Sequence, residues 1–146
     1  MVPALHPALD ASRCVPCGAC EVACVSARTG LTDLLPDDVV VLERRRLRIR
    51  VVADVPTLDV CVDCEERPCV AVCPHHALLV RPNGRVDLLE SRCTGCGHCI
   101  AACTYGAIRR VSALDLAYKC DSCAPLGHDP ACIAACPSAA LSLHPR

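Results

Sequence analysis

The chain has 146 residues and a formal net charge of −1, and this near-neutral composition argues against nucleic acid as a partner. It contains no Phe, no Trp and only two Tyr, which excludes a conventional aromatic core and leaves few rings on which bases could stack. Sixteen cysteines are present instead, so we expect them to organise the interior.

The N-terminal residues 1–13 show no sign of a targeting sequence. They include two prolines, but no basic segment, no apolar segment of signal-peptide length and no twin arginine. No apolar stretch of the chain approaches the ~18 residues that cross a bilayer. We therefore expect a cytoplasmic protein without a transmembrane segment. Export in the folded state, beside a partner that carries the signal, is the alternative.

The sixteen cysteines form four runs of four, and none is left over. Disulfide frameworks scatter cysteines over loops, whereas these runs have short spacers, mostly of two or three residues. The grouping therefore favours a metal framework. In chain order the runs are Cys14, Cys17, Cys20 and Cys24; Cys61, Cys64, Cys69 and Cys73; Cys93, Cys96, Cys99 and Cys103; and Cys120, Cys123, Cys132 and Cys136.

Residues 25–60, between the first and second runs, contain no cysteine and are interpreted as an insertion. An apolar run at 39–42 and the alternation at 47–51 predict two paired strands joined near 44–46. The same segment holds a dense group of five arginines, which suits either a solvated strand face or a docking surface for an acidic partner. The five are Arg44, Arg45, Arg46, Arg48 and Arg50.

Short apolar segments at 78–80 and 86–88 flank a turn sequence at 81–85, which predicts a small hairpin. An internal repeat follows three of the runs, because an alanine stands four residues after the last cysteine in each. These alanines are Ala77, Ala107 and Ala140, and each precedes an aliphatic residue. We expect every such run to continue into a brief helical turn and a strand.

The spacing of the two central runs is close to that of bacterial two-cluster ferredoxins, in which three thiolates come from one tight loop. The fourth cysteine lies about one helical turn farther on, away from its own loop, and in those ferredoxins it ligates the other cluster. The same rule extends to the outer runs. The predicted ligand sets are cluster 1 with Cys14, Cys17, Cys20 and Cys136; cluster 2 with Cys61, Cys64, Cys69 and Cys103; cluster 3 with Cys93, Cys96, Cys99 and Cys73; and cluster 4 with Cys120, Cys123, Cys132 and Cys24.

The nested order of the runs, the eight-residue spacer in the fourth run and Lys119 before it resemble the four-cluster ferredoxin subunits. That family serves molybdenum and tungsten oxidoreductases, formate dehydrogenases, hydrogenases and carbon monoxide dehydrogenase. The chain is also similar to the small polyferredoxin subunit of tungsten-dependent aldehyde oxidoreductases. The resemblance covers roughly residues 13–143.

The resemblance implies four 4Fe-4S clusters and an electron-transfer subunit that is not itself an enzyme. It implies a catalytic oxidoreductase subunit as one partner and a second electron donor or acceptor as the other, and it allows several copies to stack in a larger complex. The implied fold is α+β, with two nested bacterial-ferredoxin-like (βαβ)2 units in one compact domain, short helices, small hairpins and an inserted strand pair. The outer half would be residues 13–30 plus 112–146, the inner half 55–111 and the insertion 31–54.

Two other functions stay open from the residues alone. One is a freely diffusing polyferredoxin. The other is a zinc-binding interaction module, because Cys-x2-Cys pairs also bind zinc. Nothing in the sequence suggests catalysis by the protein itself, since neither a Ser/His/Asp set nor a Gly-rich phosphate loop is recognisable. Lys119 is the only lysine, and its position before a ligand suits either a charge near a cluster or plain exposure.

Overall fold

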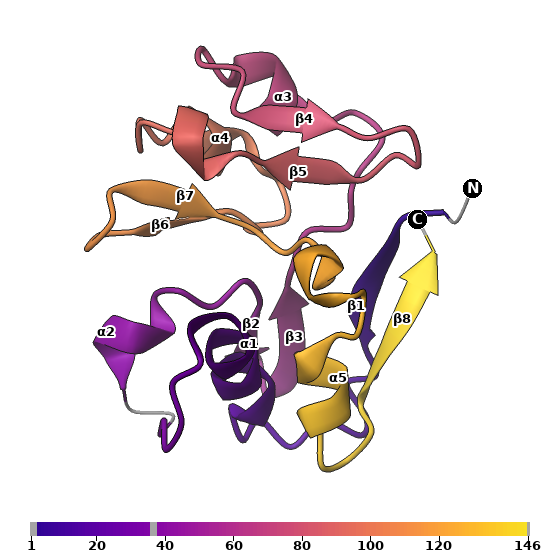
Figure 1. Cartoon of the computed structure of the whole chain (residues 1–146). Coiled ribbons are helices and arrows are strands. Elements are labelled where there is room, and N and C mark those ends of the chain that lie inside the picture. Colours follow the sequence, from indigo (N-terminus) through magenta and orange to yellow (C-terminus); the bar gives the residue numbers. More distant parts are fainter. Residues whose placement is uncertain (1–2, 36–37, 146) are drawn as a thin grey trace.

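The computed structural model describes residues 3–35 and 38–145, and its secondary structure consists of short pieces (Figure 1). Only α1 is longer than five residues among the helices described. The elements are β1 (Leu5–Leu9), α1 (Ala19–Thr29), α2 (Val39–Leu42), β2 (Arg48–Val52), β3 (Val55–Asp59), α3 (Pro68–Val72), β4 (Leu78–Val80), β5 (Val86–Leu88), α4 (His98–Ala102), β6 (Arg109–Val111), β7 (Leu116–Tyr118), α5 (Ala131–Ala135) and β8 (Leu141–Pro145), with 3-10 turns η1 (Glu90–Arg92) and η2 (Ala124–Leu126). The expectation of an α+β fold with short helices and small hairpins is confirmed.

The strands described pair in four separate antiparallel ladders, β1–β8, β2–β3, β4–β5 and β6–β7. In Figure 1 the β4–β5 and β6–β7 ladders lie with α3 and α4 in the upper part of the molecule, and α1, α5 and the remaining ladders lie below. The β1–β8 ladder brings the two chain ends side by side, with Leu5 opposite Pro145 and Leu9 opposite Leu141. The strand β1 was not expected from the sequence.

Local sequence explains where α1 begins and ends. Gly18 precedes it with φ 77°, and Gly30 ends it with φ 70° and an N–H donated to the Ser26 carbonyl. Cys20 and Cys24, four residues apart, lie on the buried face of the helix, which packs against α5. Two cysteines of one run are thus held one helical turn apart.

The predicted strand at 39–42 is wrong, because these residues form the single helical turn α2. Helix-type bonds from Arg44 N to Val41 O and from Arg45 N to Leu42 O continue that turn, so the chain cannot pair there. The strand predicted at 47–51 does form, as β2, but its partner is β3. Ala53 and Asp54, with φ 48° and 63°, make the tight connection typical of a two-residue hairpin.

The hairpin predicted at 78–80 and 86–88 is confirmed as β4 and β5. Arg81 N donates to Arg85 O over 2.7 Å, and Gly84 supplies the positive φ of 90° that the turn requires. A second hairpin is formed by β6 and β7. It spans the predicted boundary between the inner and outer halves, which lies after residue 111.

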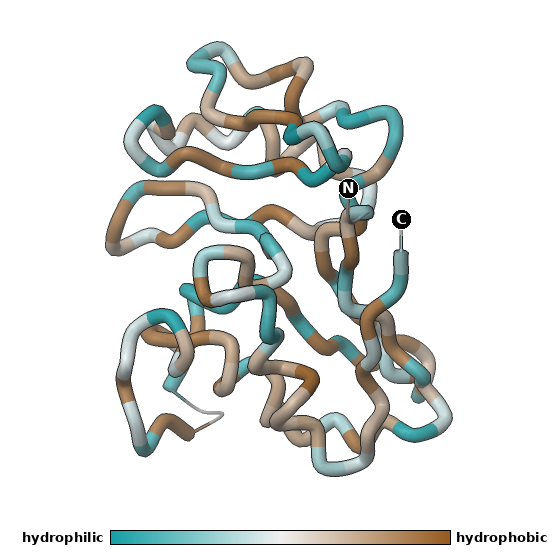
Figure 2. The backbone as a smooth tube through the Cα atoms, turned by 45° about the vertical axis from the view of Figure 1, so that its right-hand side comes forward, coloured by the Kyte–Doolittle hydropathy of each residue, from teal (hydrophilic) through white to brown (hydrophobic). Residues whose placement is uncertain are grey.

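The interior consists of two buried clusters in which cysteines stand among aliphatic residues. Cysteines are three of the six buried members of one cluster and two of the six of the other. Figure 2 shows hydrophobic residues in short stretches spread over the whole tube. No helix in residues 3–35 and 38–145 is long and apolar enough to cross a bilayer. The members are Cys20, Cys24, Leu47, Val60, Cys132 and Leu141 in the first cluster, and Cys69, Leu78, Val86, Cys99, Ile108 and Ala117 in the second.

Candidate metal centres

The four runs share one local design, a loop followed by a short helix. The third cysteine of each run lies in the helix, at Cys20, Cys69, Cys99 and Cys132. In three runs the fourth cysteine ends the helix in an extended conformation, at Cys73, Cys103 and Cys136, with ψ near 110°. The first run differs because α1 continues past Cys24 to Thr29. All sixteen cysteines are free thiols.

Two small cavities are each lined by four cysteines that come from two different runs. One is lined by Cys14, Cys17 and Cys20 of the first run together with Cys136 of the fourth. The other is lined by Cys93, Cys96 and Cys99 of the third run together with Cys73 of the second. In the described part of the chain, no three Cys, His, Asp or Glu side chains come together as a site for a single metal ion.

Cys69 marks a third group of thiols. Burial raises the pKa of Cys69 to about 11; Cys61, Cys64 and Cys103 act in the same direction, and Lys119 opposes them. The thiols that act on Cys69 in this way are therefore two of its own run and the last one of the third run. This group again joins three cysteines of one run to the last cysteine of another.

Cys132 marks the fourth group. Burial raises the pKa of Cys132, and the thiols of Cys120, Cys24 and Cys123 contribute in the same direction, followed by that of Cys20. Cys24, Cys123 and Cys132 are all buried, whereas the groups around the two cavities each contain one exposed cysteine, Cys17 or Cys96. This fourth group is therefore the most enclosed.

Backbone amides point at the cysteine sulfurs in a repeated way. Ala77 N, Ala107 N and Ala140 N lie 3.3, 3.4 and 3.3 Å from the Sγ atoms of Cys73, Cys103 and Cys136. Each donor is the repeated alanine four residues after the last cysteine of its run, so the repeat now has a structural reason. Such N–H donors stabilise a thiolate and tune a metal bound to it.

The amide donors of other cysteines come from elsewhere in the chain. Cys24 lies within a continuing helix, and its sulfur receives the N–H of Arg46 over 3.3 Å. Three further bonds, all 3.4 Å long, run from Asp63 N to Cys61 Sγ, from Ser122 N to Cys120 Sγ and from Ala117 N to Cys93 Sγ.

These residues fit an iron-sulfur cluster. Burial raises the pKa of both Cys20 and Cys120 to about 12, so without metal these side chains are neutral thiols at neutral pH. A bound cluster replaces the protons, and the thiolates are then stabilised by iron and by the amide donors. Such a cluster supplies one-electron redox chemistry.

Comparison with known proteins settles the family. The family described as the 4Fe-4S dicluster domain matches residues 52–146. The chain belongs to this family. The prediction of an iron-sulfur family is therefore confirmed, and so is the 4Fe-4S cofactor. Sixteen cysteines are consistent with four such clusters.

Relatives of this 4Fe-4S dicluster protein match nearly all of its sequence. It is 37% identical over 150 residues to "Electron transport protein HydN" of Escherichia coli (strain K12), across 90% of this sequence and 83% of the relative. It is 34% identical to "Thiosulfate reductase electron transfer subunit PhsB" of Salmonella typhi, across 90% and 71%. It is 30% identical to "Formate dehydrogenase-O iron-sulfur subunit" of Escherichia coli (strain K12), across 91% and 50%.

The arginine segment of this dicluster protein lies differently from the sequence expectation. The Arg46 side chain is only 12% exposed and turns inward. Its guanidinium lies 4.5 Å from the centroid of the Tyr118 ring, and its Nη1 donates to Lys119 O over 3.0 Å. Nothing in a run of similar arginines distinguishes the inward-facing Arg46 from Arg48, which is exposed.

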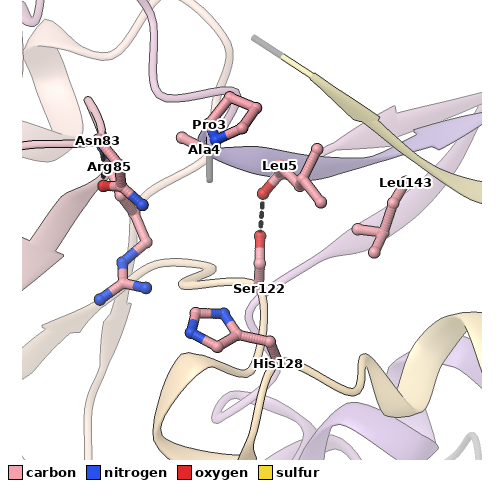
Figure 3. A pocket seen from close by; sticks show the side chains of 8 residues that line it. All are labelled: Pro3, Ala4, Leu5, Asn83, Arg85, Ser122, His128 and Leu143. Carbon is pink, nitrogen blue, oxygen red and sulfur yellow. Dashed lines mark hydrogen bonds between the residues drawn. The ribbon is translucent and has the colours of Figure 1, made fainter. Parts of the chain in front are cut away.

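Another pocket, of about 280 Å³, lies between the N-terminal segment and the loop after Cys123 (Figure 3). It is lined by no cysteine. Ser122 Oγ donates a hydrogen bond to Leu5 O at its edge. Since Ser122 N also donates to Cys120 Sγ, this serine connects β1 directly to the fourth cysteine run. The pocket is lined by Pro3, Ala4, Leu5, Asn83, Arg85, Ser122, His128 and Leu143.

Proposed function

We propose that the protein is the electron-transfer iron-sulfur subunit of an oxidoreductase complex. It relays single electrons through four 4Fe-4S clusters between a catalytic subunit and a second redox partner. The observation that carries this proposal is the gathering of sixteen free cysteines into four groups of four, with amide donors aimed at their sulfurs. Relatives with electron-transfer names match this protein across 90% of its sequence.

The ligand sets follow the rule that each run lends its last cysteine. The two cysteine-lined cavities support clusters 1 and 3, and the mutual influence of the thiols around Cys69 and Cys132 supports clusters 2 and 4. The proposed sets are Cys14, Cys17, Cys20 and Cys136 for cluster 1; Cys61, Cys64, Cys69 and Cys103 for cluster 2; Cys93, Cys96, Cys99 and Cys73 for cluster 3; and Cys120, Cys123, Cys132 and Cys24 for cluster 4.

The helices suggest the order in which electrons pass. The packed pair α1 and α5 carries ligands of clusters 1 and 4, and the packed pair α3 and α4 carries ligands of clusters 2 and 3. Lys119 lies beside both Cys61 of cluster 2 and Cys120 of cluster 4. Cys17 and Cys96, the exposed cysteines, belong to clusters 1 and 3. The proposed relay therefore runs 1–4–2–3, with its ends at the surface.

The same pairs support the nested fold. We propose an outer ferredoxin-like (βαβ)2 unit of residues 13–30 plus 112–146 around an inner unit of 55–111, with 31–54 inserted. The packing of α1 on α5 supports the outer unit, and the packing of α3 on α4 beside β4 and β5 supports the inner one. The β6–β7 hairpin forms the junction between them.

The partners follow from a relay with two ends. One is a catalytic subunit of a molybdenum or tungsten enzyme, a hydrogenase or a similar oxidoreductase, and the other is an electron donor or acceptor. Copies stacked in a larger complex would lengthen the relay. We place the protein in the cytoplasm, where thiols remain reduced until clusters are inserted.

Anaerobic size-exclusion of native extract tests the complex. We expect the brown protein to elute with a catalytic subunit whose substrate either bleaches the visible absorption of the oxidised clusters or restores that of the dithionite-reduced clusters. A brown protein that elutes alone and does not respond in this way would instead be a free polyferredoxin, and a colourless protein that contains zinc would be an interaction module.

A surface variant tests the ends of the relay in the same complex. Val15 is 59% exposed and lies between two ligands of cluster 1, so Val15→Glu should slow electron exchange with one partner at least tenfold while iron content is retained. Val40→Glu, at a 74% exposed valine in α2, is the matched control. Equal rates for the two variants would contradict the placement of cluster 1 at an end.

A further inference from the structure

Lys119 is the only lysine of the protein, and its side chain is 1% exposed. Ammonium groups are almost never buried to this extent unless they are paired. Electron transfer through the clusters does not by itself explain a buried cation at this position. Its location between β7 and Cys120 places it where the inner and outer halves meet.

The Lys119 ammonium contacts both halves. Nζ donates to the carbonyl of Val86 in β5, and it donates over 2.7 Å to the carbonyl of Cys120. It also lies 3.8 Å from Oδ1 of Asp63, which belongs to the loop of the second cysteine run. Three segments that are distant in sequence therefore converge on one charge.

Asp63 is built into the same group. It is 4% exposed, and its Oδ1 accepts the N–H of Val86 over 2.9 Å. The same oxygen lies 3.6 Å from Cys61 Sγ, and Asp63 N donates to that sulfur over 3.4 Å. The buried Lys119 and Asp63 thus form one ionic group beside the half-buried cluster 2 ligand Cys61.

The charge of Lys119 persists despite its burial. Its Nζ donates to the carbonyls of Val86 and Cys120 and lies 3.8 Å from Oδ1 of Asp63, so the ammonium form is hydrogen-bonded and paired where it is buried. Reduction potentials of 4Fe-4S clusters depend on nearby charge and on hydrogen bonds to the sulfurs. A fixed cation beside ligands of two clusters favours the added electron on either of them, because the interaction is weakly screened in the interior.

We propose that Lys119 is a positioning residue that holds a permanent positive charge at the junction of clusters 2 and 4 and raises the reduction potentials of both relative to clusters 1 and 3. Asp63 holds the ammonium in place and opposes part of its effect. An electron that arrives from either end of the relay is then more stable on cluster 4 or cluster 2, in the middle. One of these two clusters is reduced as the other is oxidised. This inference rests on the proposed ligand sets.

Redox titration of the iron-loaded protein, followed by electron paramagnetic resonance, tests the role. In Lys119→Met two of the four one-electron steps should move to more negative potential, and the other two should stay in place. Asp63→Asn keeps an acceptor for Val86 N–H and should move the same two steps in the opposite direction. Arg110→Met removes an exposed cation, 54% accessible and paired with Asp115, and should leave all four steps unchanged.

Each outcome decides between the proposals. Iron-loaded Lys119→Met with unshifted steps, or with all four shifted equally, overturns the role of Lys119 and leaves the relay intact. A wild-type protein without four one-electron steps overturns the relay itself. If Lys119→Met does not retain its iron, Lys119→Gln decides, because it keeps an amide donor for the carbonyls that Lys119 contacts but removes the charge. The same two steps should again move to more negative potential, and unshifted steps would overturn the role of Lys119.

Discussion

Removal of the clusters under anaerobic conditions is expected to abolish the fold. The two buried clusters of side chains contain no aromatic residue, and cysteines make up three of six and two of six of their members. A domain is stabilised by only about 5–15 kcal/mol in total, so the loss of the bonds that join these cysteines leaves too little to hold the chain. Far-UV circular dichroism should show loss of most helical signal when iron is stripped by an oxidant with a chelator.

The chelator alone provides the control, because it should leave both the clusters and the dichroism unchanged. Return of iron and sulfide to the stripped protein should restore the signal together with the brown colour. A stripped protein that keeps its dichroism and a cooperative unfolding transition would show that the aliphatic residues suffice, and the role of the clusters in folding would have to be abandoned.

Cys136→Ser is expected to remove a ligand from cluster 1 and not from the cluster of its own run. Cys136 lines the cavity that also contains Cys14, Cys17 and Cys20, and Ala140 N donates to its sulfur. We expect damage confined to cluster 1, with at most about four irons lost. Alkylation followed by mass spectrometry should find the three remaining ligands of cluster 1 newly reactive, while Cys120, Cys123 and Cys132 stay protected.

The matched control is Cys132→Ser, four residues before Cys136 and within helix α5, which Cys136 ends. It should produce the reverse pattern, in which Cys24, Cys120 and Cys123 become reactive and the cysteines of cluster 1 remain protected. Both substitutions remove one thiol. They differ only in position, since the two thiols lie one helical turn apart. If both variants expose the same cysteines, the last cysteine of a run serves its own cluster, and the proposed ligand sets are wrong.

Short-range sequence signals predicted the fold where the turn residues are decisive. The β4–β5 hairpin was predictable because Asn83 and Gly84 specify its turn. The partner of β2 was not, because Pro56 made β3 look unlike a strand. A proline is tolerated in this two-stranded ladder, where each strand has a free edge. The β1–β8 pairing joins the two ends of the chain, and no local pattern encodes such a contact.

Spacing alone also indicated that cysteine forms the candidate site, because an iron cube requires thiolates at fixed intervals, and the grouping of the sixteen into ligand sets stays a prediction. The residues around the cysteines were less accessible. From the sequence, Lys119 could be either exposed or near a cluster, and no pattern assigns a role to Asp63. Burial of these two side chains depends on how the inner and outer halves meet, which is a tertiary property that periodicity does not report.

Iron and acid-labile sulfide analysis of anaerobically prepared protein is the most direct test of the central claim. Protein concentration should come from amino-acid analysis, because a protein with no Trp and two Tyr absorbs weakly at 280 nm. Four 4Fe-4S clusters predict about sixteen irons and about sixteen sulfides per molecule. A protein that is fully loaded with metal but contains about eight irons or fewer, or zinc in place of iron, would contradict the account.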